Sequence, residues 1–442
     1  MAGENMSKLP GGGEVLRRLK EAGFKAYCVG GCVRDSVMGR PCHDIDITTD
    51  ARPEEVIAVF GEKDTVPTGI RFGTVTVLRE FEVTTFRIDG EYSDHRSPDN
   101  VDFTGSLEED LSRRDFTMNA MAMDENGCIT DPWEGRRDIE RKVIRCVGDP
   151  EKRFEEDALR MLRAMRFASQ LGFTIDPESA RQIHAMKSGL RDIAQERIRD
   201  ELDKLLCGPA CAQVLIDYSD VIGEFIPEIV PCIGLDQRTP YHIYTVWEHI
   251  ARAVESAPED DLFLRRTLFF HDIGKPACAR YDETGRGHFK GHDAVGAAMT
   301  GEIMTRMRWD KKTVSRTVEL IARHSVKLRD RIGVRQMMRE IGDEAFFRLM
   351  ELKKCDNLGK APFVAEENIF FDKLISEGRR IVSQDLCRSV KGLEVSGQEL
   401  ADLGLKGQEI GAALEELLDK VITEELPNSR EELIGYIRRC KG

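Results

Sequence analysis

Residues 27–50, "YCVGGCVRDSVMGRPCHDIDITTD", combine a short apolar run, a double glycine and two aspartates in one stretch. The apolar run predicts a strand that ends at Val29. Gly30 and Gly31 then predict a tight turn, and "CVRDSVM" predicts the start of a helix. The N–H groups and dipole of such a helix can bind a phosphate group, and Arg34 would add positive charge. This order predicts an α/β fold with a phosphate-binding site.

The two aspartates of this stretch, Asp44 and Asp46, are separated by one residue in a β-like run. Side chains two positions apart in a strand project from the same face. Two carboxylates on one face can hold two Mg²⁺ ions about 3.5–4 Å apart, which suits phosphoryl or nucleotidyl transfer. Glu82, in the strand-like "FEVTTFR", is a candidate third carboxylate. A Gly-Gly turn or an Asp-x-Asp pair alone is common without function, but their order and spacing favour a nucleotide-transfer site.

Two kinds of sequence pattern follow one another along the 442 residues. Residues 13–145 mix alternating apolar stretches with helical ones, which predicts an α/β domain. From about residue 151, apolar residues recur at helical spacing, so the remainder is predicted to be all α. A chain of this length exceeds what one hydrophobic core usually supports. The predicted fold class is therefore α+β, with an N-terminal mixed-sheet domain followed by helical domains.

The composition restricts the cellular setting. The chain has a net charge of −14, twelve cysteines without CxxC spacing, and no apolar run resembling a signal peptide or a membrane span. We expect a cytoplasmic protein with reduced thiols and no membrane partner. Residues 306–339 hold eleven Lys or Arg against three acids, and residues 394–432 hold eleven acids against three bases. The basic run is either a surface for a phosphate backbone or a set of solvated helix faces, whereas the acidic run favours solvated faces.

Four motifs in order resemble those of bacterial tRNA nucleotidyltransferases and poly(A) polymerases, the class II CCA-adding family. They are "GGCVRDSVMGRPCHDIDITT", "RRDFTMNAMA" (113–122), "DPWEGRRDI" (131–139) and "FEEDALRMLRAMRFASQLGF" (154–173). The resemblance implies that Asp44 and Asp46, assisted by Glu82, hold Mg²⁺. It implies that the substrates are CTP, ATP and tRNA, and no role for DNA is expected. The implied domains are a nucleotidyltransferase head (1–145), a helical neck with a nucleotide-selecting helix (146–207), a helical body with an HD domain (208–375) and a helical tail (376–442).

Acidic and basic residues recur in the fourth motif, at Glu156, Asp157, Arg160, Arg163 and Arg166. We expect them in one helical run, with the last four near one face. A ladder of surface ion pairs is the simplest interpretation. The alternative is base selection, because a carboxylate accepts from the amino group of cytosine or adenine and a guanidinium donates to the adjoining ring nitrogen or carbonyl. The resemblance implies that Asp157 and Arg160 read the base, and that Arg163 and Arg166 support the site or the phosphates.

The second motif has a similar pair of interpretations. Its charged residues could form a solvated cluster, yet the resemblance implies that Arg114 contacts the triphosphate and that Asp115 and Asn119 order the ribose side. These residues join Arg34 and the glycine turn as candidate nucleotide-binding groups. The polar loop upstream contains "DHR" at residues 94–96. Family members that add only CC are thought to lack this element, so its presence favours addition of the full CCA.

A further constellation consists of histidines and aspartates in the helical part, at His249, His271, Asp272, His292, His324 and Asp356. Any single histidine would more often be structural. The order H…HD…H…H…D with "HDIGK" resembles an HD-type metal phosphohydrolase module. Its imidazole and carboxylate ligands suit a transition metal, which activates water against a phosphate ester. Some CCA-adding enzymes carry such a module, with cyclic phosphodiesterase or phosphatase activity on RNA ends. The basic run brackets His324, so RNA near this site is a testable expectation.

These observations favour a CCA-adding tRNA nucleotidyltransferase with an additional HD phosphohydrolase module. A poly(A) polymerase or an A-adding enzyme would instead incorporate ATP alone, although the acidic tail argues against a poly(A) polymerase with a basic C-terminal extension. An HD phosphohydrolase whose head only binds nucleotide or RNA would keep its main activity after Asp44→Ala and lose it after His271→Ala. An RNA-binding protein without catalysis would survive both substitutions.

Overall fold

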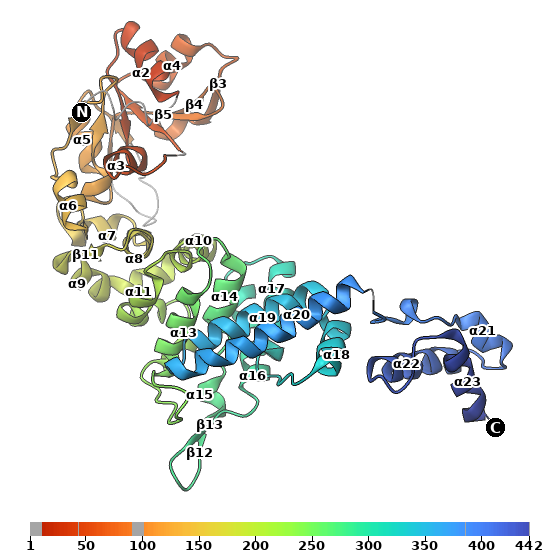
Figure 1. Ribbon diagram of the computed structural model, residues 1–442. Helices are drawn as coiled ribbons and strands as arrows, with labels where there is room; N and C mark the ends of the chain where they lie inside the picture. Colours follow the sequence, from red (N-terminus) through yellow and green to blue (C-terminus); the bar gives the residue numbers. More distant parts are fainter. Residues whose placement is uncertain (1–10, 43, 91–100, 385, 442) are drawn as a thin grey trace. The chain divides into compact units, whose positions relative to one another are not determined.

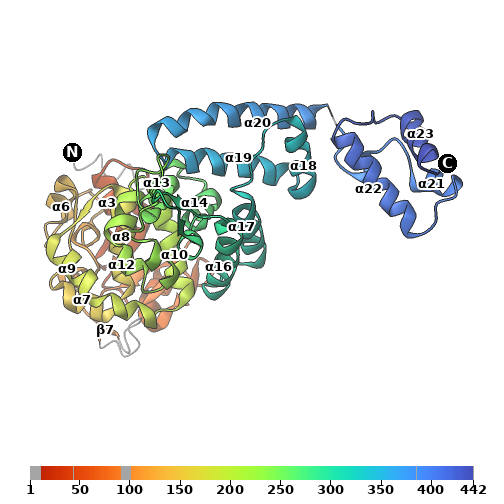
Figure 2. The same ribbon diagram turned by 90° about the horizontal axis from the view of Figure 1, so that it is seen from below.

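The computed structural model describes residues 11–42, 44–90, 101–384 and 386–441. The chain divides between Pro227 and Glu228 into two compact units, which Figure 1 and Figure 2 show from two directions. A mixed β-sheet occupies the first unit, and helices make up most of the second. The predicted α+β class is therefore confirmed. Among the helices described, none has the length and apolar character needed to cross a lipid bilayer.

The first unit is organised around a seven-stranded sheet in the order β3-β4-β5-β2-β1-β8-β9. β2 and β5 are parallel, and the other neighbouring pairs are antiparallel. Alternate residues of β5 are buried, as the period-2 pattern predicts. The strands are β1 (Ala26–Val29), β2 (Asp46–Thr49), β3 (Thr65–Gly69), β4 (Thr74–Val77), β5 (Phe81–Thr85), β8 (Ala122–Met123) and β9 (Ile129–Thr130).

Short helices surround this sheet. α2 (Gly12–Glu21) packs on β1 and β2 through the buried side chains of Val15 and Leu19, which are one helical turn apart. α4 (Pro53–Phe60) packs on β4 and β5. A separate two-stranded sheet is formed by β6 (Arg87–Asp89) and β7 (Val101–Phe103). The remaining helices of this region are α3 (Gly31–Val37), α5 (Leu107–Ser112) and α6 (Gly135–Arg141).

One expected helix is in fact two. α7 (Pro150–Glu156) ends before Asp157, and α8 (Leu159–Leu171) begins after it. Asp157 has φ −144° and ψ 103°, which is extended backbone. Its carboxylate accepts the backbone N–H of Leu159 at 3.0 Å, and this local bond competes with continuation of the helix. The expectation of a single helical run through Asp157 is therefore wrong.

Helices complete the first unit, with one exception to the all-α expectation. β10 (Val143–Ile144) precedes α7 in the sequence and β11 (Thr174–Ile175) follows α8, and the two strands pair in parallel. The helices that follow β11 are α9 (Pro177–Met186), α10 (Gln195–Leu206), α11 (Cys211–Asp217) and α12 (Ser219–Ile222). α8 packs on α10 and α11, which brings its basic residues close to buried parts of α10.

The second unit is helical apart from a small hairpin of β12 (Arg280–Tyr281) and β13 (Gly287–His288). α13 (Val246–Ser256) packs on α14 (Leu262–Phe270), with Trp247 and Phe269 in edge-to-face contact. α19 (Asp343–Leu358) and α20 (Asn368–Ser383) lie side by side. The other helices are α15 (Lys275–Cys278), α16 (His292–Arg306), α17 (Lys311–Arg323), α18 (Arg331–Ile341), α21 (Gly397–Asp402), α22 (Gln408–Ile422) and α23 (Arg430–Lys441).

The basic and acidic runs contact one another within this unit. Arg339 on α18 pairs with Glu415 and Asp419 on α22, and Arg331 pairs with Glu424. Arg335 is 4% exposed and donates to backbone carbonyls of α22 and of the segment before α21. Three of the eleven cations of the basic run therefore anchor the acidic C-terminal segment, so the run is not one continuous surface for a phosphate backbone.

Candidate functional site

The glycine turn lies between β1 and α3, as the sequence predicts. Gly30 has φ +76°, a conformation that favours glycine. A Cβ atom on Gly30 would lie 3.2 Å from Arg114 Nη1 and 3.6 Å from Asp46 Oδ2. The missing side chain therefore lets an arginine and a carboxylate approach the turn closely.

The three candidate carboxylates meet at the same end of the sheet. Asp46 is the first residue of β2, and it is in register with Val29 of β1 and with Glu82 of β5. Partial burial raises the pKa of Asp46, Arg114 lowers it, and Glu82 and Asp44 raise it further. Carboxylate oxygens are ligands that suit Mg²⁺. The donor oxygens of Asp44, Asp46 and Glu82 are not gathered within 4.8 Å of one another, unlike the two closer groups that occur among the described residues.

A cavity of about 470 Å³ opens beside these carboxylates. It brings together ten of the sequence-predicted residues: Gly30, Gly31, Arg34, Asp44, Asp46, Arg114, Asp115, Asn119, Arg163 and Arg166. It does not include Glu82, Asp157 or Arg160. Its lining also contains Phe167, whose ring lies 4.1 Å from the Arg166 guanidinium carbon. Sequence reasoning missed Phe167, although an aromatic residue directly after a series of arginines on a helix is a usable signal for a stacking contact.

A hydrogen-bonded framework supports this cavity. Arg34 donates to Asn119 at 3.0 Å, and Asn119 donates to Asp115 at 3.1 Å. Arg163 donates to the other oxygen of Asp115 at 2.6 and 2.9 Å. Arg166 lies 2.7 Å from the buried carboxylate of Glu201 on α10. Because each guanidinium has five N–H groups, these contacts orient the arginines and leave donors for an anionic ligand.

Asp115 is ionised at neutral pH because of this framework. Burial alone would raise its pKa, but the charge of Arg163, the hydrogen bonds and the charge of Arg160 lower it to about 2. The negative charge therefore persists and holds Arg163 in place.

This framework predicts a pH-dependent contribution to stability. Since the pKa of Asp115 is lower in the folded state than its ordinary value of 3.8, the contribution is present above about pH 4 and is lost as the pH falls towards 2. Asp115→Asn should lower the free energy of unfolding by about 2 kcal/mol at pH 6. Urea unfolding of both proteins at pH 6, 4 and 3 should show the difference shrinking. The exposed Asp64→Asn variant serves as control, and a difference independent of pH would contradict the prediction.

Asp157 and Arg160 are held by other protein groups. Asp157 accepts a hydrogen bond from Arg197 of α10 at 3.0 Å. Arg160 is 9% exposed and donates to Glu156 at 2.7 Å and to the carbonyl of Arg113 at 3.2 Å. Their implied role as base readers stays a prediction. The "DHR" element at residues 94–96 lies outside the described residues.

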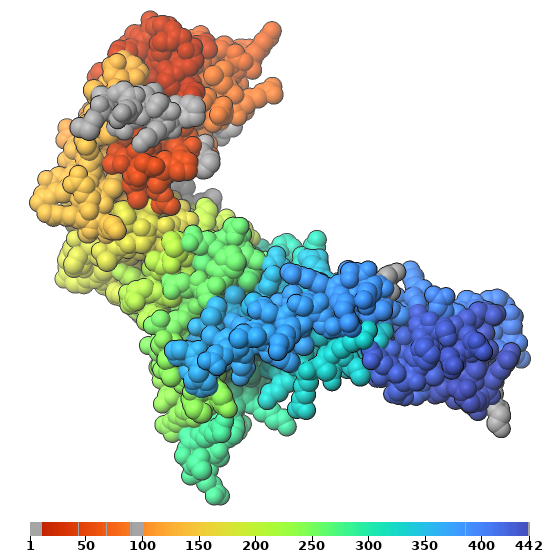
Figure 3. All heavy atoms as spheres, viewed as in Figure 1, coloured from red at the N-terminus to blue at the C-terminus, as the bar shows by residue number. Residues whose placement is uncertain are grey.

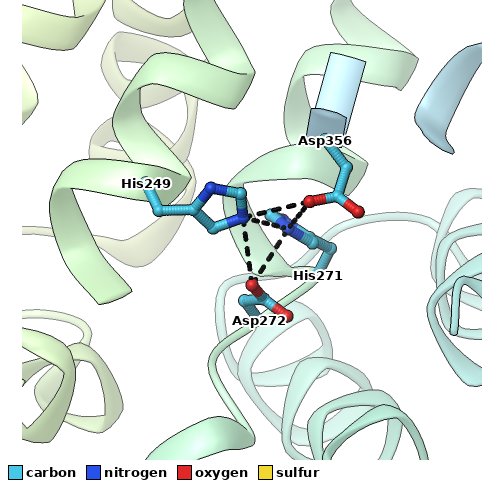
Figure 4. A group of neighbouring side chains, drawn as sticks. All are labelled: His249, His271, Asp272 and Asp356. Atoms are coloured by element: carbon cyan, nitrogen blue, oxygen red, sulfur yellow. Dashed lines mark hydrogen bonds and ion pairs between the residues drawn. The ribbon is translucent and has the colours of Figure 1, made fainter. Parts of the chain in front are cut away.

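The second unit gathers all six predicted HD residues. Figure 4 shows His249 of α13, His271 and Asp272 directly after α14, and Asp356 of α19. His249 Nε2 lies 3.1 Å from Asp272 Oδ2 and 3.1 Å from Asp356 Oδ1. His271 Nε2 lies 3.3 and 3.5 Å from the same two oxygens. Four potential metal ligands therefore converge from three helical segments.

A second group shares Asp272 with the first. Its other oxygen, Oδ1, lies 3.3 Å from His292 Nε2 and 3.5 Å from His324 Nε2. Each group has its donor atoms within 4.8 Å of one another. Burial opposes ionisation of Asp272, but His271, Lys275 and His249 lower its pKa well below the ordinary value, so it can act as an anionic ligand to both groups.

The histidine tautomers fit a metal centre. The Nδ1 atoms of His249, His271, His292 and His324 all lie 2.6–2.9 Å from backbone carbonyl oxygens. An Nδ1–H that donates to a carbonyl leaves the lone pair on Nε2. The Nε2 atoms nevertheless lie only 3.2 Å apart in one pair and 3.1 Å in the other. Facing lone pairs repel unless a proton or a cation lies between them, so this donor set fits metal ions.

Comparisons with known proteins match the regions that contain both sites. Three family models match: "Poly A polymerase head domain" over residues 26–145, "Probable RNA and SrmB-binding site of polymerase A" over 172–229 and "HD domain" over 239–358. The CCA-adding enzyme of Levilactobacillus brevis is 34% identical over 432 residues, which are 96% of each chain. The chain belongs to the CCA-adding enzyme family. The family resemblance of the four motifs is thereby confirmed.

Other members of this family match more strongly over shorter regions. The CCA-adding enzyme of Geobacillus thermodenitrificans is 52% identical over 204 residues, which are 46% of this chain and 50% of the relative. The crystal structure of Bacillus stearothermophilus CCA-adding enzyme in complex with CTP is 28% identical, covers 98% of both chains and has a TM-score of 0.72.

Proposed function

We propose that this protein adds C, C and A to the 3′ end of tRNA, using CTP and ATP. The observation that carries the proposal is the cavity beside Asp44 and Asp46, which is lined by Arg34, Arg114 and Arg163. Carboxylates that suit Mg²⁺ and guanidinium groups that suit a triphosphate are what nucleotidyl transfer requires. The similarity to CCA-adding enzymes over nearly the whole chain favours tRNA as the acceptor.

In the proposed reaction, the 3′-hydroxyl oxygen of the RNA forms a bond to the α-phosphorus of the nucleotide. The bond from that phosphorus to the β-phosphate oxygen breaks, and pyrophosphate leaves. Asp44 and Asp46, assisted by Glu82, would hold Mg²⁺, which lowers the pKa of an attacking hydroxyl and neutralises leaving phosphates. Arg114 and Arg163 would bind the triphosphate, since guanidinium groups form bidentate contacts with phosphate oxygens.

Base selection is assigned to Asp157 and Arg160 in this proposal. A carboxylate that accepts from the amino group of cytosine or adenine repels the carbonyl oxygen of uracil or guanine at the same edge. Asp157 bonds to Arg197 and Arg160 bonds to Glu156, so base reading would require both side chains to exchange these partners for the nucleotide.

The arrangement of domains follows from the same proposal. Residues 1–145 would be the catalytic head and 146–207 the nucleotide-selecting neck. Residues 208–375 would be the HD-containing body and 376–442 the tail. The protein would act in the cytoplasm, with no DNA or membrane partner.

The proposal is tested by extension of tRNA that ends at the discriminator base, with Mg²⁺ present. CTP alone should add two nucleotides, ATP alone none, and both together three, as resolved by gel electrophoresis to one nucleotide. These stops are expected because the acceptor end and the selecting side chains together determine which base is accepted. Long tails with ATP alone would identify a poly(A) polymerase, a single added A would identify an A-adding enzyme, and no extension would contradict transferase activity.

We infer a second activity for the HD site, hydrolysis of a phosphate ester. The supporting observation is the pair of ligand groups that share Asp272. Imidazole and carboxylate ligands suit transition metals, which activate water for attack on phosphorus. His249, His271, Asp272 and Asp356 would hold one ion, and Asp272, His292 and His324 would hold a second.

A further inference from the structure

A large cavity adjoins the HD ligands. Its volume is about 1240 Å³, and Asp272, His292, His324 and Asp356 form part of its lining. Cavities that bind one small molecule usually measure about 300–1,000 Å³. This cavity therefore has room for more than one phosphate ester of ordinary size beside the metal ligands.

The unpaired charge of this cavity is positive. Lys290, Lys327 and Arg329 are exposed on its lining, and none of the three has an ion pair or hydrogen bond among the described residues. The other three lysines of the lining have partners. Lys275 pairs with Asp272, Lys360 pairs with Asp356, and Lys353 donates to the backbone carbonyls of His324 and Val326. Free cations spread along a surface suit a chain of phosphates better than a single one.

Two of the four carboxylates of the same lining are engaged, since Asp272 and Asp356 belong to the ligand groups and pair with Lys275 and Lys360. Among the described residues, Asp293 and Glu367 are the lining carboxylates without an ion pair, against the three cations. The balance still favours an anionic ligand on this lining.

Exposed aromatic rings lie on the same lining. Tyr241 is 44% exposed and Phe370, near the start of α20, is 39% exposed. Phe363 is 53% exposed and extends the surface, with its ring centre 6.0 Å from that of Tyr241. α20 is visible on the surface of the second unit in Figure 3. Rings left in solvent beside unpaired cations offer stacking faces for unpaired nucleobases.

We propose that Tyr241, Lys290, Lys327, Arg329 and Phe370, which we term the rim, bind a single-stranded RNA end. The bases would stack on Tyr241 and Phe370, the internal phosphates would pair with the three cations, and the terminal phosphate would reach the HD ligands. Single-stranded RNA is favoured because stacking on side chains requires bases that are not paired. The proposal deepens the inferred phosphohydrolase activity and rests on it for the fate of the terminal phosphate.

Photocrosslinking to the metal-free full-length protein tests the location directly. The probe is an eight-nucleotide RNA with 5-iodouridine at its last position and a 3′-phosphate, which leaves no 3′-hydroxyl for extension. Mass spectrometry should find the adduct on Tyr241 or Phe370. Adducts confined to the first unit would overturn the proposal. Because this readout needs neither metal nor hydrolysis, it is independent of the inferred activity.

Matched variants test which side chains contribute to binding. Tyr241→Ala should reduce the crosslink in the second unit about ten-fold, whereas Tyr281→Ala should not, although Tyr281 is also 44% exposed. The plot of log affinity against log salt concentration has a negative slope, and the double variant Lys327→Ala with Arg329→Ala should make this slope less steep by about 1.4. Lys311→Ala with Lys312→Ala is its control, since both of these lysines are exposed outside the cavity. Equal effects of variant and control would overturn the proposal.

Kinetics separate the rim from the metal site. With a transition metal added, Tyr241→Ala should raise KM for the RNA 3′-phosphate about ten-fold, whereas Tyr281→Ala should leave this KM within two-fold of wild type. If the wild-type protein does not hydrolyse the RNA 3′-phosphate, the inferred activity fails while the crosslink still decides the rim. If Tyr241→Ala instead dissociates a dimer seen by light scattering, the rim is an interface between copies and the RNA proposal is wrong.

Discussion

Replacing Asp46 by asparagine is expected to lower the rate of nucleotide addition on the order of a thousand-fold. Asp46 lies in register with Glu82 and beside the glycine turn, so its carboxylate faces both the other acids and the cavity. Asparagine keeps the size of the side chain but removes one anionic oxygen and the negative charge, both of which Mg²⁺ requires. Single-turnover extension of tRNA with radiolabelled CTP measures the rate directly.

The control for this experiment is Asp64→Asn. Asp64 is an exposed carboxylate of the same unit outside the cavity, so its variant should add nucleotides at the wild-type rate. Because Asp46 lines the cavity rather than the hydrophobic core and asparagine keeps its size, its variant should also unfold at the wild-type temperature. A folded Asp46→Asn protein that retains more than about a tenth of the wild-type rate would contradict the proposed role.

The glycine turn and its carboxylates could be predicted because their signals are local. A double glycine after an apolar run specifies a turn with positive φ, and alternation places Asp44 and Asp46 on one face. The structure adds that a Cβ on Gly30 would contact Arg114, which lies far along the sequence. Contacts of this kind depend on strand order, and the order β5-β2-β1-β8 cannot be read from periodicity.

The break at Asp157 shows where periodicity misleads. Apolar residues continue at helical spacing on both sides of Asp157, so the pattern alone predicts one helix. Aspartate can bond to a nearby backbone N–H, and here its bond to Leu159 begins a new helix. Arg197, from α10, then accounts for the other oxygen of Asp157. That partner is 40 residues away, and nothing in the motif identifies it.

The two charge runs were likewise ambiguous in the sequence. Either run could have faced solvent, and the basic one could have faced RNA. The structure pairs Arg331 and Arg339 with the acidic segment, which explains part of both runs. Among the described residues, Lys311, Lys312, Lys327 and Arg329 of the basic run have no ion pair, and of these Lys327 and Arg329 lie at the HD cavity.

For the HD residues, the sequence predicted six candidate ligands but not their division into two groups. The structure brings all six residues together, and their role as metal ligands stays a prediction. That Asp272 directs one oxygen to each group depends on how α13, α16, α17 and α19 pack around it. This sharing makes Asp272 the residue on which both ligand groups depend.

Asp272→Asn should therefore abolish metal retention and HD hydrolysis together while leaving nucleotide addition within two-fold of wild type. The amide offers one oxygen and no charge, so it cannot serve both groups as an anionic ligand. We expect two transition-metal ions per wild-type chain, measured by inductively coupled plasma mass spectrometry after dialysis, and fewer than one in the variant. Hydrolysis of p-nitrophenyl phosphate should fall on the order of a thousand-fold.

His292→Ala and Asp260→Asn serve to separate loss of a metal ligand from loss of folding. Asp272→Asn leaves the buried Lys275 without its ion pair, which is expected to cost about 3 kcal/mol of stability in the metal-free protein. His292→Ala removes a ligand of the second group only, so its metal content should fall from two ions to one while the first group stays intact. Asp260→Asn, an exposed carboxylate of the same unit, should retain both ions. If Asp272→Asn keeps two ions or wild-type hydrolysis, Asp272 is not a shared ligand. If a folded Asp272→Asn protein loses nucleotide addition, the two sites are not functionally separate.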